Sequence, residues 1–583
     1  MPAGPPHDPA RRERRIIGGL LALLVAFHLW GALVAWSSLN LPGGEFRQAQ
    51  TAISTWFIQQ EGNFSPAYPT PVLGKPWSIP MEFPLYQWTV AGLSAVTGWP
   101  LTQTGRGVSL ACFYLTLPAL WLLLGRLGLT RPQRAVGLGL VLTCPLYIYY
   151  ARAFLIETMA LMFSAWFLVA FLRAVEGRSR RWLVLANLCG IGAGLVKVTT
   201  FMLFLLPAGL VAATWLWQAR PTRGAPGAGR CAGLAGWIAA ATAAPFLATL
   251  AWIRFADGVK RLNPSARFLE SGNLTGFNFG TAETRFSAET LVQHWQNITS
   301  AVVWPPVLAL AVGLALTVSR RRWRPLLLCL GCYLVVLALF PTLYAVHEYY
   351  AVANAVFLLA ALGVALAGLW DTRLPRAVVA AVLLGVGAAQ AGLYLRGYYP
   401  GQKGISPGGS GLTAVLREIT GPDEVLVVAG DDWSSITPYY AQRRALMIRH
   451  GLQDQTEYLQ AAFATLADER VGAMVLQGPL RTNYQFRDRL LAAFELDPRP
   501  VCTWRDATVY VPVEQRIRII RQLGPQAFDE VRLAPGADLP APGALGGEWR
   551  QLADLTPEER GRFATMSPQP VGFFSSFGPG LEM

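Results

Sequence analysis

The sequence contains about eleven long apolar runs separated by short loops, and this pattern limits the folds open to it. A helix that crosses a bilayer needs roughly 20 apolar residues, and in lipid only helices or closed barrels satisfy every backbone polar group. Hydrophobic residues make up 53% of the chain and charged residues only 14%. We therefore predict a mainly α, polytopic membrane protein with about eleven transmembrane helices. The predicted spans lie near 16–38, 105–125, 134–150, 154–173, 182–197, 200–218, 231–255, 299–319, 325–343, 349–370 and 376–396.

Arginine is concentrated in every second loop of this arrangement. If residues 1–15 form a cytoplasmic basic tail, all of these loops fall inside, as the positive-inside rule requires. The net charge of +14 lies largely in such loops, so we expect no nucleic-acid partner. The first span has no small-residue cleavage site after a short apolar core and is expected to stay as an anchor. The arginine-rich loops are Arg126–Arg134, Arg173–Arg181, Arg220–Arg230, Arg320–Arg324 and Asp371–Arg376.

Two longer loops, 39–104 and 256–298, fall on the outer side of the predicted transmembrane domain 16–396. The first includes an apolar run at 84–99, which is short for a crossing. Counting it as a span would place every later arginine-rich loop outside. Its aromatic residues suit a membrane interface, so we predict that it lies along the outer surface.

The character of the chain changes after residue 396. Residues 397–411 are Gly/Ser-rich and predict a linker. Short apolar runs that begin near Glu424, Ala473 and Thr508 predict strands, with helical stretches between them. We therefore expect a small α/β domain at 412–514, on the extracytoplasmic side. Residues 515–583 form a Pro/Gly-rich extension with one basic helical stretch.

The first outer loop carries two carboxylates, Glu45 and Glu82, in segments expected to lie against the membrane. Arg47 stands two residues after Glu45. Paired carboxylates are the usual groups for deprotonating a hydroxyl nucleophile. An ordinary solvated loop with scattered charges is the competing interpretation.

Further ionisable residues stand at other outer turns: Arg152, Glu157, Lys197, His347 and Glu348, followed by Tyr349. Ionisable groups at membrane depth are expensive, so their convergence on one side predicts a polar reaction or binding site. The structural alternative is that Glu157 simply pairs with Arg152 or Lys197.

Two short motifs are better explained by packing than by chemistry. Cys329 and Cys332 resemble a CxxC pair, but they lie among leucines and valines inside a span. Gly190-Ile-Gly-Ala-Gly resembles a phosphate loop, but it also lies inside a span and lacks the G-K-[ST] ending. Close helix packing explains it better. No compact ligand motif demands a metal, although the outer acids could hold a divalent cation.

The outer-face segments resemble those of the bacterial GT-C glycosyltransferases, relatives of the protein O-mannosyltransferases and the lipid A aminoarabinose transferases. Five segments occur in the family's order over residues 16 to about 400. The departures are Glu45 and Glu157 where the family often has Asp, and Gln50 in place of a second Asp. The matching segments are Glu45-Phe-Arg-Gln-Ala-Gln-Thr-Ala, Glu82-Phe-Pro-Leu-Tyr, Ala151-Arg-Ala-Phe-Leu-Ile-Glu-Thr-Met, Leu195-Val-Lys and His347-Glu-Tyr-Tyr.

The resemblance implies a multi-pass enzyme of the bacterial inner membrane. It would move a sugar from a polyprenyl-phosphate donor to a protein, lipid or glycan acceptor, with inversion. Glu45 would be the general base, with Glu82 as the second catalytic carboxylate. The remaining residues would bind substrate, with Arg47, Arg152, Lys197 and His347 facing the donor phosphate.

Two other classes fit the same hydropathy pattern. A transporter or lipid-linked sugar flippase would more often show inverted repeats and helices broken at the midplane. A membrane scaffold would not need several acids and bases on one face. The outer-end position of the charges and the long first outer loop favour the enzyme.

Overall fold

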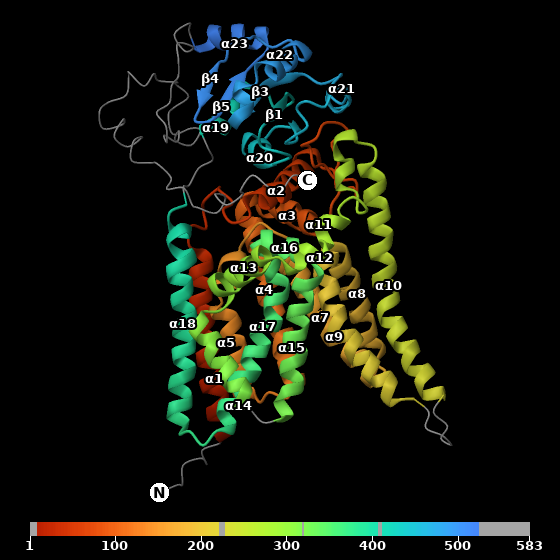
Figure 1. The fold of residues 1–583 in the computed structure, drawn as a ribbon, viewed down its shortest axis with the longest axis vertical. Helices are drawn as coiled ribbons and strands as arrows, with labels where there is room; N and C mark the ends of the chain where they lie inside the picture. The colour runs from red at the N-terminus through yellow and green to blue at the C-terminus, as the bar shows by residue number, and fades with distance from the viewer. Residues whose placement is uncertain (1–8, 221–227, 318–319, 406–410, 524–583) are drawn as a thin grey trace, which may run out of the picture.

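The computed structural model describes residues 9–220, 228–317, 320–405 and 411–523. A bundle of helices carries a sheet domain at one end (Figure 1). The long bundle helices are α1 Pro9–Leu33, α4 Leu101–Arg126, α5 Arg131–Thr143, α7 Glu157–Gly177, α8 Arg180–Val196, α9 Val198–Gln218, α10 Ala228–Lys260, α14 Pro305–Thr317, α15 Arg320–Leu339, α17 Ala351–Leu366 and α18 Arg376–Lys403.

Shorter segments join them. These are α6 Pro145–Tyr150, η1 Pro264–Leu269, α11 Thr275–Phe279, α12 Ala282–Phe286, α13 Ala288–Asn297, η2 Ile298–Val302, α16 Pro341–Val346, η3 Glu348–Tyr350 and η4 Ala367–Asp371.

Eight helices in the described residues are long and apolar enough to cross a membrane, or up to nine if one bent pair counts as a single span. That pair is Ala288–Val302 with Pro305–Thr317, bent by 99°. Each predicted run is mostly helical where the structure describes it, but α5, α8 and α14 are only 13, 17 and 13 residues long. The run 134–150 breaks at Pro145, which has no N–H to continue the helical ladder. A multi-pass membrane protein is confirmed, and the count of eleven stays a prediction.

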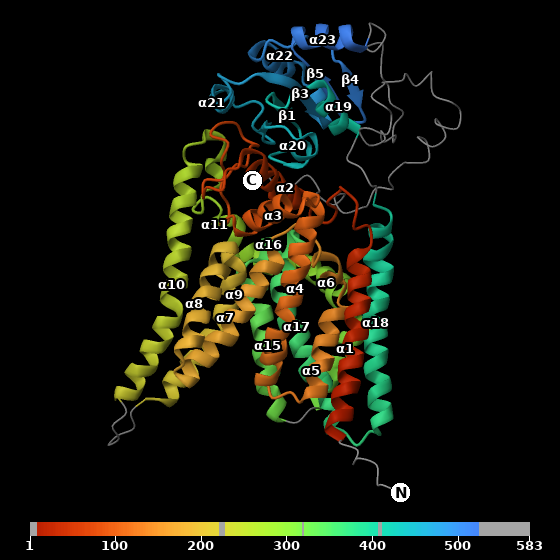
Figure 2. The ribbon, with the colours of Figure 1, turned by 180° about the vertical axis from the view of Figure 1, so that it is seen from behind.

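Two ion pairs gather arginine-rich turns at one end of the bundle. Arg126, at the end of α4, pairs with Glu176, at the end of α7. Arg322 of α15 pairs with Asp371, before α18, at 2.5 Å. Figures 1 and 2 show these turns at the end far from the sheet domain. The common placement is what the arginine pattern predicts.

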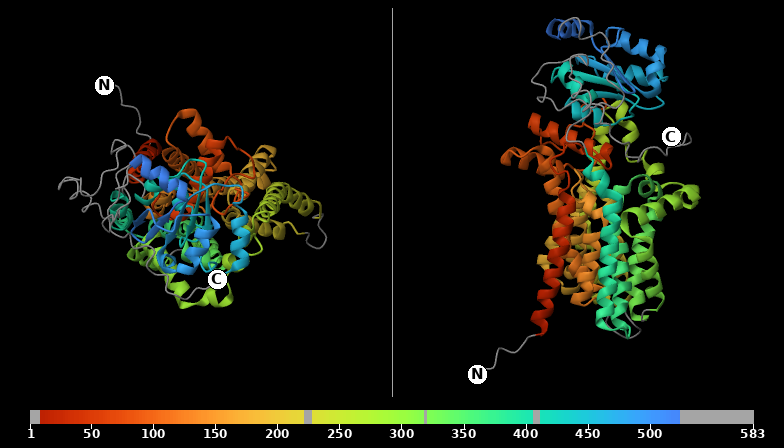
Figure 3. Two further views of the ribbon diagram at one scale, coloured as in Figure 1. Left: turned by 90° about the horizontal axis from the view of Figure 1, so that it is seen from above. Right: turned by 90° about the vertical axis from the view of Figure 1, so that its left-hand side faces the viewer.

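The opposite end of the bundle is covered by two helices of the first outer loop, α2 Glu45–Glu61 and α3 Leu85–Thr97. They lie across the bundle rather than along it, between the long helices and the sheet domain (Figure 3). This agrees with the prediction that residues 84–99 do not cross the membrane. The acidic residues of this loop therefore lie between the bundle and the sheet domain.

The sheet domain contains five strands in the order β2-β1-β3-β5-β4. The pairs β1–β2 and β1–β3 are parallel, whereas β3–β5 and β4–β5 are antiparallel. The three predicted strands correspond to β1, β3 and β5. The elements are α19 Gly411–Ile419, β1 Val425–Ala429, α20 Ile436–Ala441, β2 Ala445–Ile448, α21 Thr456–Ala464, β3 Val471–Gln477, η5 Gly478–Thr482, α22 Tyr484–Ala493, β4 Cys502–Trp504, β5 Ala507–Tyr510 and α23 Val513–Leu523.

Three boundaries differ from the sequence prediction. Helix α1 already begins at Pro9, inside the predicted basic tail, because arginines are good helix formers. Helix α18 continues to Lys403, past the linker start predicted at 397, and buried Gln402 donates to Gly31 O at 2.8 Å. Helix α23 includes the basic stretch predicted within 515–583. The rest of that extension lies outside the described residues.

The first outer loop is hydrogen-bonded to the edge of the sheet. Ala445 N donates to Pro71 O and Met447 N donates to Val72 O, both at 2.9 Å. Leu73 forms an isolated antiparallel bridge with Leu446, next to these two bonds. Because these bonds continue the ladder of β2, the sheet domain is held directly over α2.

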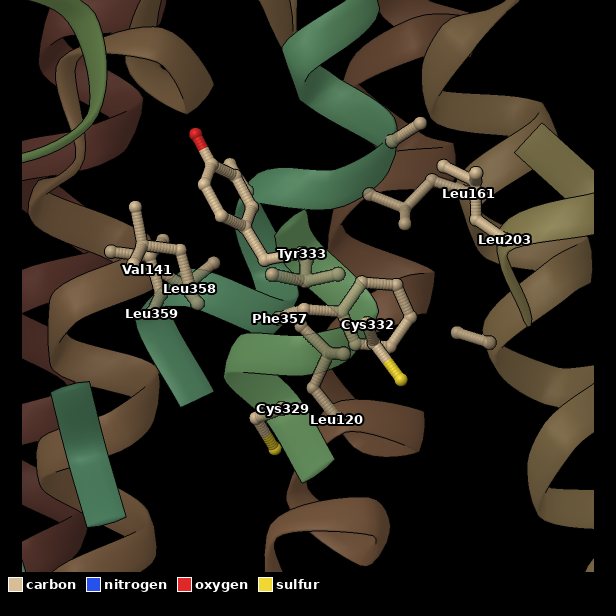
Figure 4. Close-up of a cluster of buried hydrophobic side chains, with 14 of the residues drawn as sticks. Leu120, Val141, Leu161, Leu203, Cys329, Cys332, Tyr333, Phe357, Leu358 and Leu359 are labelled. Atoms are coloured by element: carbon tan, nitrogen blue, oxygen red, sulfur yellow. The ribbon is translucent and has the colours of Figure 1, made fainter. Parts of the chain in front are cut away.

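Packing explains the two motifs set aside in the sequence. Figure 4 shows Cys329 and Cys332 among apolar side chains such as Leu120 and Phe357, and both thiols are buried. A Cβ added to Gly190 of α8 would stand 2.6 Å from Pro245 and 2.9 Å from Phe167. The glycine therefore permits close contact of α8 with α7 and α10, as predicted.

Candidate active site

Two consecutive glycines place the first residue of α2. Gly43 and Gly44 have φ of 79° and 66°, which glycine adopts at little cost. A Cβ on Gly43 would lie 2.3 Å from the ring of Tyr149, and one on Gly44 would lie 2.9 Å from the ring of Tyr349. Both conformation and close approach therefore require glycine here, and they bring Glu45 into the first turn of α2 beside these two tyrosines.

Gln48 holds the same turn against the rest of the site. Its Nε2 lies within 3.0 Å of three carbonyl oxygens in the segment before α2, from Leu41 to Gly43. Its Oε1 accepts a hydrogen bond from Phe154 N at 2.8 Å. The buried amide thereby fixes α2 relative to the turn that carries Arg152.

Glu45 is held by a residue of the sheet domain. The hydroxyl of Tyr440, on α20, donates to Glu45 Oε1 at 2.8 Å and accepts from Leu41 N at 2.9 Å. No described Lys, Arg or His lies within ion-pair distance of Glu45. Burial raises the pKa of Glu45, and the Tyr440 hydrogen bond offsets that rise only in part. The result is a carboxylate poised to accept a proton.

Glu82 has a different environment, because it forms an ion pair with Arg47. The same guanidinium also donates to Gln50 Oε1. Although burial opposes its charge, the pKa of Arg47 is raised by Glu82, Tyr349, Tyr350 and Glu157. Arg47 thus connects the first outer loop to residues from two other turns.

Lys197 and Glu157 form a buried ion pair at 2.5 Å, and neither side chain is more than 4% exposed. The ammonium also lies 3.8 Å from the ring centroid of Tyr350, a cation–π contact. Glu157 Oε2 has no hydrogen-bond partner. Of the two partners proposed for Glu157 from the sequence, the structure selects Lys197.

His347 lies beside these charged residues and stacks on neighbouring tyrosines. Its ring stacks on those of Tyr349 and Tyr350, with centroids 5.4 and 5.7 Å apart. Burial, followed by the charges of Lys197 and Arg47, lowers the pKa of His347 to about 4. The imidazole is therefore neutral at neutral pH and contributes a polar group rather than a positive charge.

Two predicted residues lie apart from this cluster. Glu348 accepts hydrogen bonds from Tyr150 and Tyr398, at 2.9 and 2.5 Å. Arg152 donates to Val34 O at 2.6 Å and Ala35 O at 3.4 Å, where α1 ends. Within the described residues, Arg152 is therefore bound to the backbone alone, and Glu45 and Glu348 are carboxylates held by tyrosines. The other predicted residues form what we call the paired cluster: Arg47, Glu82, Glu157, Lys197, His347 and Tyr349.

Sequence reasoning missed three site residues. Tyr440 stands 395 positions from Glu45, and nothing in its neighbourhood marks it. Gln48 lies within a segment already singled out, and its polarity in a buried turn was a usable signal. Arg106 is buried and donates to the carbonyls of Trp36, Ser38 and Asn40. An arginine at the outer end of a span could have been found from the sequence. In the described residues no group of three His, Cys, Asp or Glu is placed to hold a metal.

Two crystal structures of ArnT from Cupriavidus metallidurans share the fold. The one bound to undecaprenyl phosphate has a TM-score of 0.54 and 16% identity, over 84% of this chain and 98% of that chain. The apo structure has a TM-score of 0.53 and 16% identity, over 85% and 98%. A weaker likeness is to AglB from Archaeoglobus fulgidus, an archaeal oligosaccharyltransferase (TM-score 0.47, 13% identity, 80% and 70% covered). No protein family model and no curated protein matches. ArnT is a lipid A aminoarabinose transferase, so the predicted GT-C fold is confirmed.

Proposed function

We propose that this GT-C chain is a glycosyltransferase of the bacterial inner membrane. It moves a sugar from a polyprenyl-phosphate donor to a hydroxyl acceptor on the extracytoplasmic side. The observation that carries the proposal is Glu45, a half-buried carboxylate held by a neutral hydroxyl, at the start of the helix that also carries Arg47. The undecaprenyl phosphate bound to ArnT, which has the same fold, supports the class of donor.

In the proposed reaction Glu45 removes the proton from the acceptor hydroxyl as its oxygen attacks the anomeric carbon. The new glycosidic C–O bond forms on the face opposite the phosphate, so the configuration is inverted. The bond from the anomeric carbon to the phosphate oxygen breaks, and polyprenyl phosphate leaves with the electron pair. A base in this role contributes typically 10²–10⁴-fold.

The leaving phosphate gains negative charge, and preorganised cations stabilise such charge. Lys197 and Arg47 are the nearest candidates, because each belongs to the cluster around Tyr349 and Tyr350. His347 adds a neutral polar group. Arg152 is a further cation in the proposal, and its guanidinium already binds the carbonyls of Val34 and Ala35, just after α1.

Sidedness is part of the proposal. The arginine-rich turns face the cytoplasm, and the sheet domain lies outside with Glu45. Reporter fusions at Gly128, in the turn between α4 and α5, and at Gly451, after β2, test this directly. We expect opposite signals from the two positions, and equal signals would overturn the topology.

Purified protein incubated with radiolabelled polyprenyl-phosphate mannose, glucose or arabinose tests the activity. We expect transfer to an added acceptor, or slow hydrolysis of the donor to free sugar. Donor that stays intact with every sugar and acceptor tried, while the protein is folded, would count against the enzyme. Vesicle assays showing movement of intact lipid-linked sugar would instead support a flippase.

A further inference from the structure

A small pocket lies beside the paired cluster, between α2, α3 and the loop that connects them. One face of α2 contributes Arg47, Gln50 and Ser54, at positions i, i+3 and i+7. Tyr68, Glu82 and Gln87 close the other sides. The pocket has space for about one water-sized group. Every lining residue except Met81 carries a polar side-chain group.

Two buried amide atoms in this lining have no partner. Gln50 and Gln87 are each 4% exposed. Gln50 Nε2 and Gln87 Oε1 make no hydrogen bond, whereas Gln50 Oε1 accepts from Arg47. A buried polar atom without a partner costs free energy, so one free donor and one free acceptor in the same pocket point to an occupant.

The other polar groups of the pocket are already engaged. Ser54 and Thr70 share a hydrogen bond of 2.8 Å, and the Tyr68 hydroxyl donates to Glu82 O at 3.1 Å. On this side the Arg47 guanidinium is already engaged by Glu82 and by Gln50 Oε1. The pocket therefore offers its two free amide atoms, and the occupant that fits them is an uncharged group that both donates and accepts.

We propose that this pocket binds one hydroxyl group of the transferred sugar. A hydroxyl can donate to Gln87 Oε1 and accept from Gln50 Nε2 at the same time. The inference rests on the proposed function, because Arg47 links the pocket to the cluster assigned to the donor phosphate. A sugar bonded to that phosphate extends one arm past Arg47. The pocket thereby selects a neutral sugar with a hydroxyl at one ring position.

The test compares the sugar donor that the wild-type protein transfers with its monodeoxy analogues, each lacking one hydroxyl. A site built to bond a hydroxyl rejects the analogue without it by a large factor, so we expect one analogue to lose on the order of 10²-fold or more in kcat/KM. Gln87→Met should reduce that discrimination to about tenfold or less. The deoxy donor itself should be used nearly as well by Gln87→Met as by the wild type.

Gln59→Met is the matched control, because Gln59 is on α2 but donates to Ser94 Oγ at 3.2 Å, away from the pocket. It should leave the discrimination unchanged. If Gln87→Met does not fold, Gln87→Asn, which withdraws the amide by one methylene, should still lower the discrimination.

The outcomes separate the two levels of the proposal. Wild-type protein that transfers no donor overturns the proposed function and the pocket with it. Wild-type protein that transfers its donor but tolerates every monodeoxy analogue equally leaves the enzyme intact and shows that the pocket holds water only. If the wild type discriminates among the analogues and neither Gln87→Met nor Gln87→Asn changes that discrimination, another part of the protein selects the sugar and the pocket does not.

Discussion

The site contains two kinds of carboxylate, and their surroundings differ in one respect. Glu82 and Glu157 are each paired with a cation, Arg47 and Lys197 respectively. Glu45 and Glu348 are instead held by tyrosine hydroxyls. In such a pair the carboxylate is bound to a cation, whereas Glu45 has only a neutral hydroxyl as its partner and can accept a proton from an acceptor. The comparison favours Glu45 over Glu82 as the base and gives the paired region an electrostatic role.

Replacing Glu45 gives the largest expected loss. Glu45→Gln keeps the size of the side chain but cannot accept a proton, so transfer should fall on the order of 10²–10⁴-fold. Glu45→Asp should be milder, since related enzymes often have Asp at this position. The measurement is kcat under conditions where chemistry limits the rate.

Glu61→Gln, on the same helix but paired with the distant Arg444, is the control and should keep nearly full activity. Near-normal turnover by Glu45→Gln would show that Glu45 is not the general base, and Glu82 would then be the next candidate for that role.

In the paired region, Lys197→Met should cost stability as well as activity. It leaves Glu157 buried without its partner, which typically costs about 3–5 kcal/mol and should be visible in a thermal melt. Adding Glu157→Gln should restore the melting temperature, because no charge is then left unpaired. Transfer should stay low in the double variant, since the cation for the phosphate is still missing. Recovery of both stability and transfer would exclude the phosphate role of Lys197.

The hydroxyl that holds Glu45 should affect the pH dependence. Tyr440→Phe removes the one hydrogen bond that lowers the pKa of Glu45, so that pKa should rise further. Because the base acts when deprotonated, the acid limb of the kcat/KM profile should move to higher pH.

Tyr439→Phe is the matched control, since its hydroxyl faces Thr102 at 3.4 Å and not Glu45. If Tyr440→Phe lowers the maximum of kcat/KM without shifting its acid limb along the pH axis, Tyr440 contributes to packing and does not set the pKa of Glu45.

The smallest effect is expected at the second tyrosine-held carboxylate. Glu348→Gln leaves an amide oxygen that can still accept from Tyr150 or Tyr398, so kcat/KM should fall less than about tenfold. A small loss for Glu348→Gln beside a large loss for Glu45→Gln would show that only one of the two tyrosine-held carboxylates takes part in the chemistry. A loss as large as that of Glu45→Gln would place Glu348 in the chemistry.

The sequence was sufficient for features that depend on local pattern. The arginine alternation predicted which turns share an end, and the outer-face segments marked Glu45, Glu82 and Glu157 before any geometry was known. The choice between Arg152 and Lys197 as partner of Glu157 depends on how α8 meets α7, which no spacing encodes. Tyr440 was beyond prediction because its role arises from contact between segments far apart in the chain. Strand β4 has only 3 residues, and β2 is an apolar run of 4 residues between arginines, whereas the 4-residue β5 lies in the longer run Thr508-Val-Tyr-Val-Pro-Val.

The pairing of Pro71–Leu73 with β2 has a consequence for the solubility of the sheet domain. Strand β2 is at the end of the sheet, and an unpaired strand edge is a template for association with other chains. In the whole protein the outer loop occupies that edge, and Asn263 Nδ2 secures the loop through Leu73 O at 3.2 Å. A fragment of residues 411–523 alone would lack this cover. We therefore expect the excised domain to self-associate even where the full chain in detergent stays monodisperse.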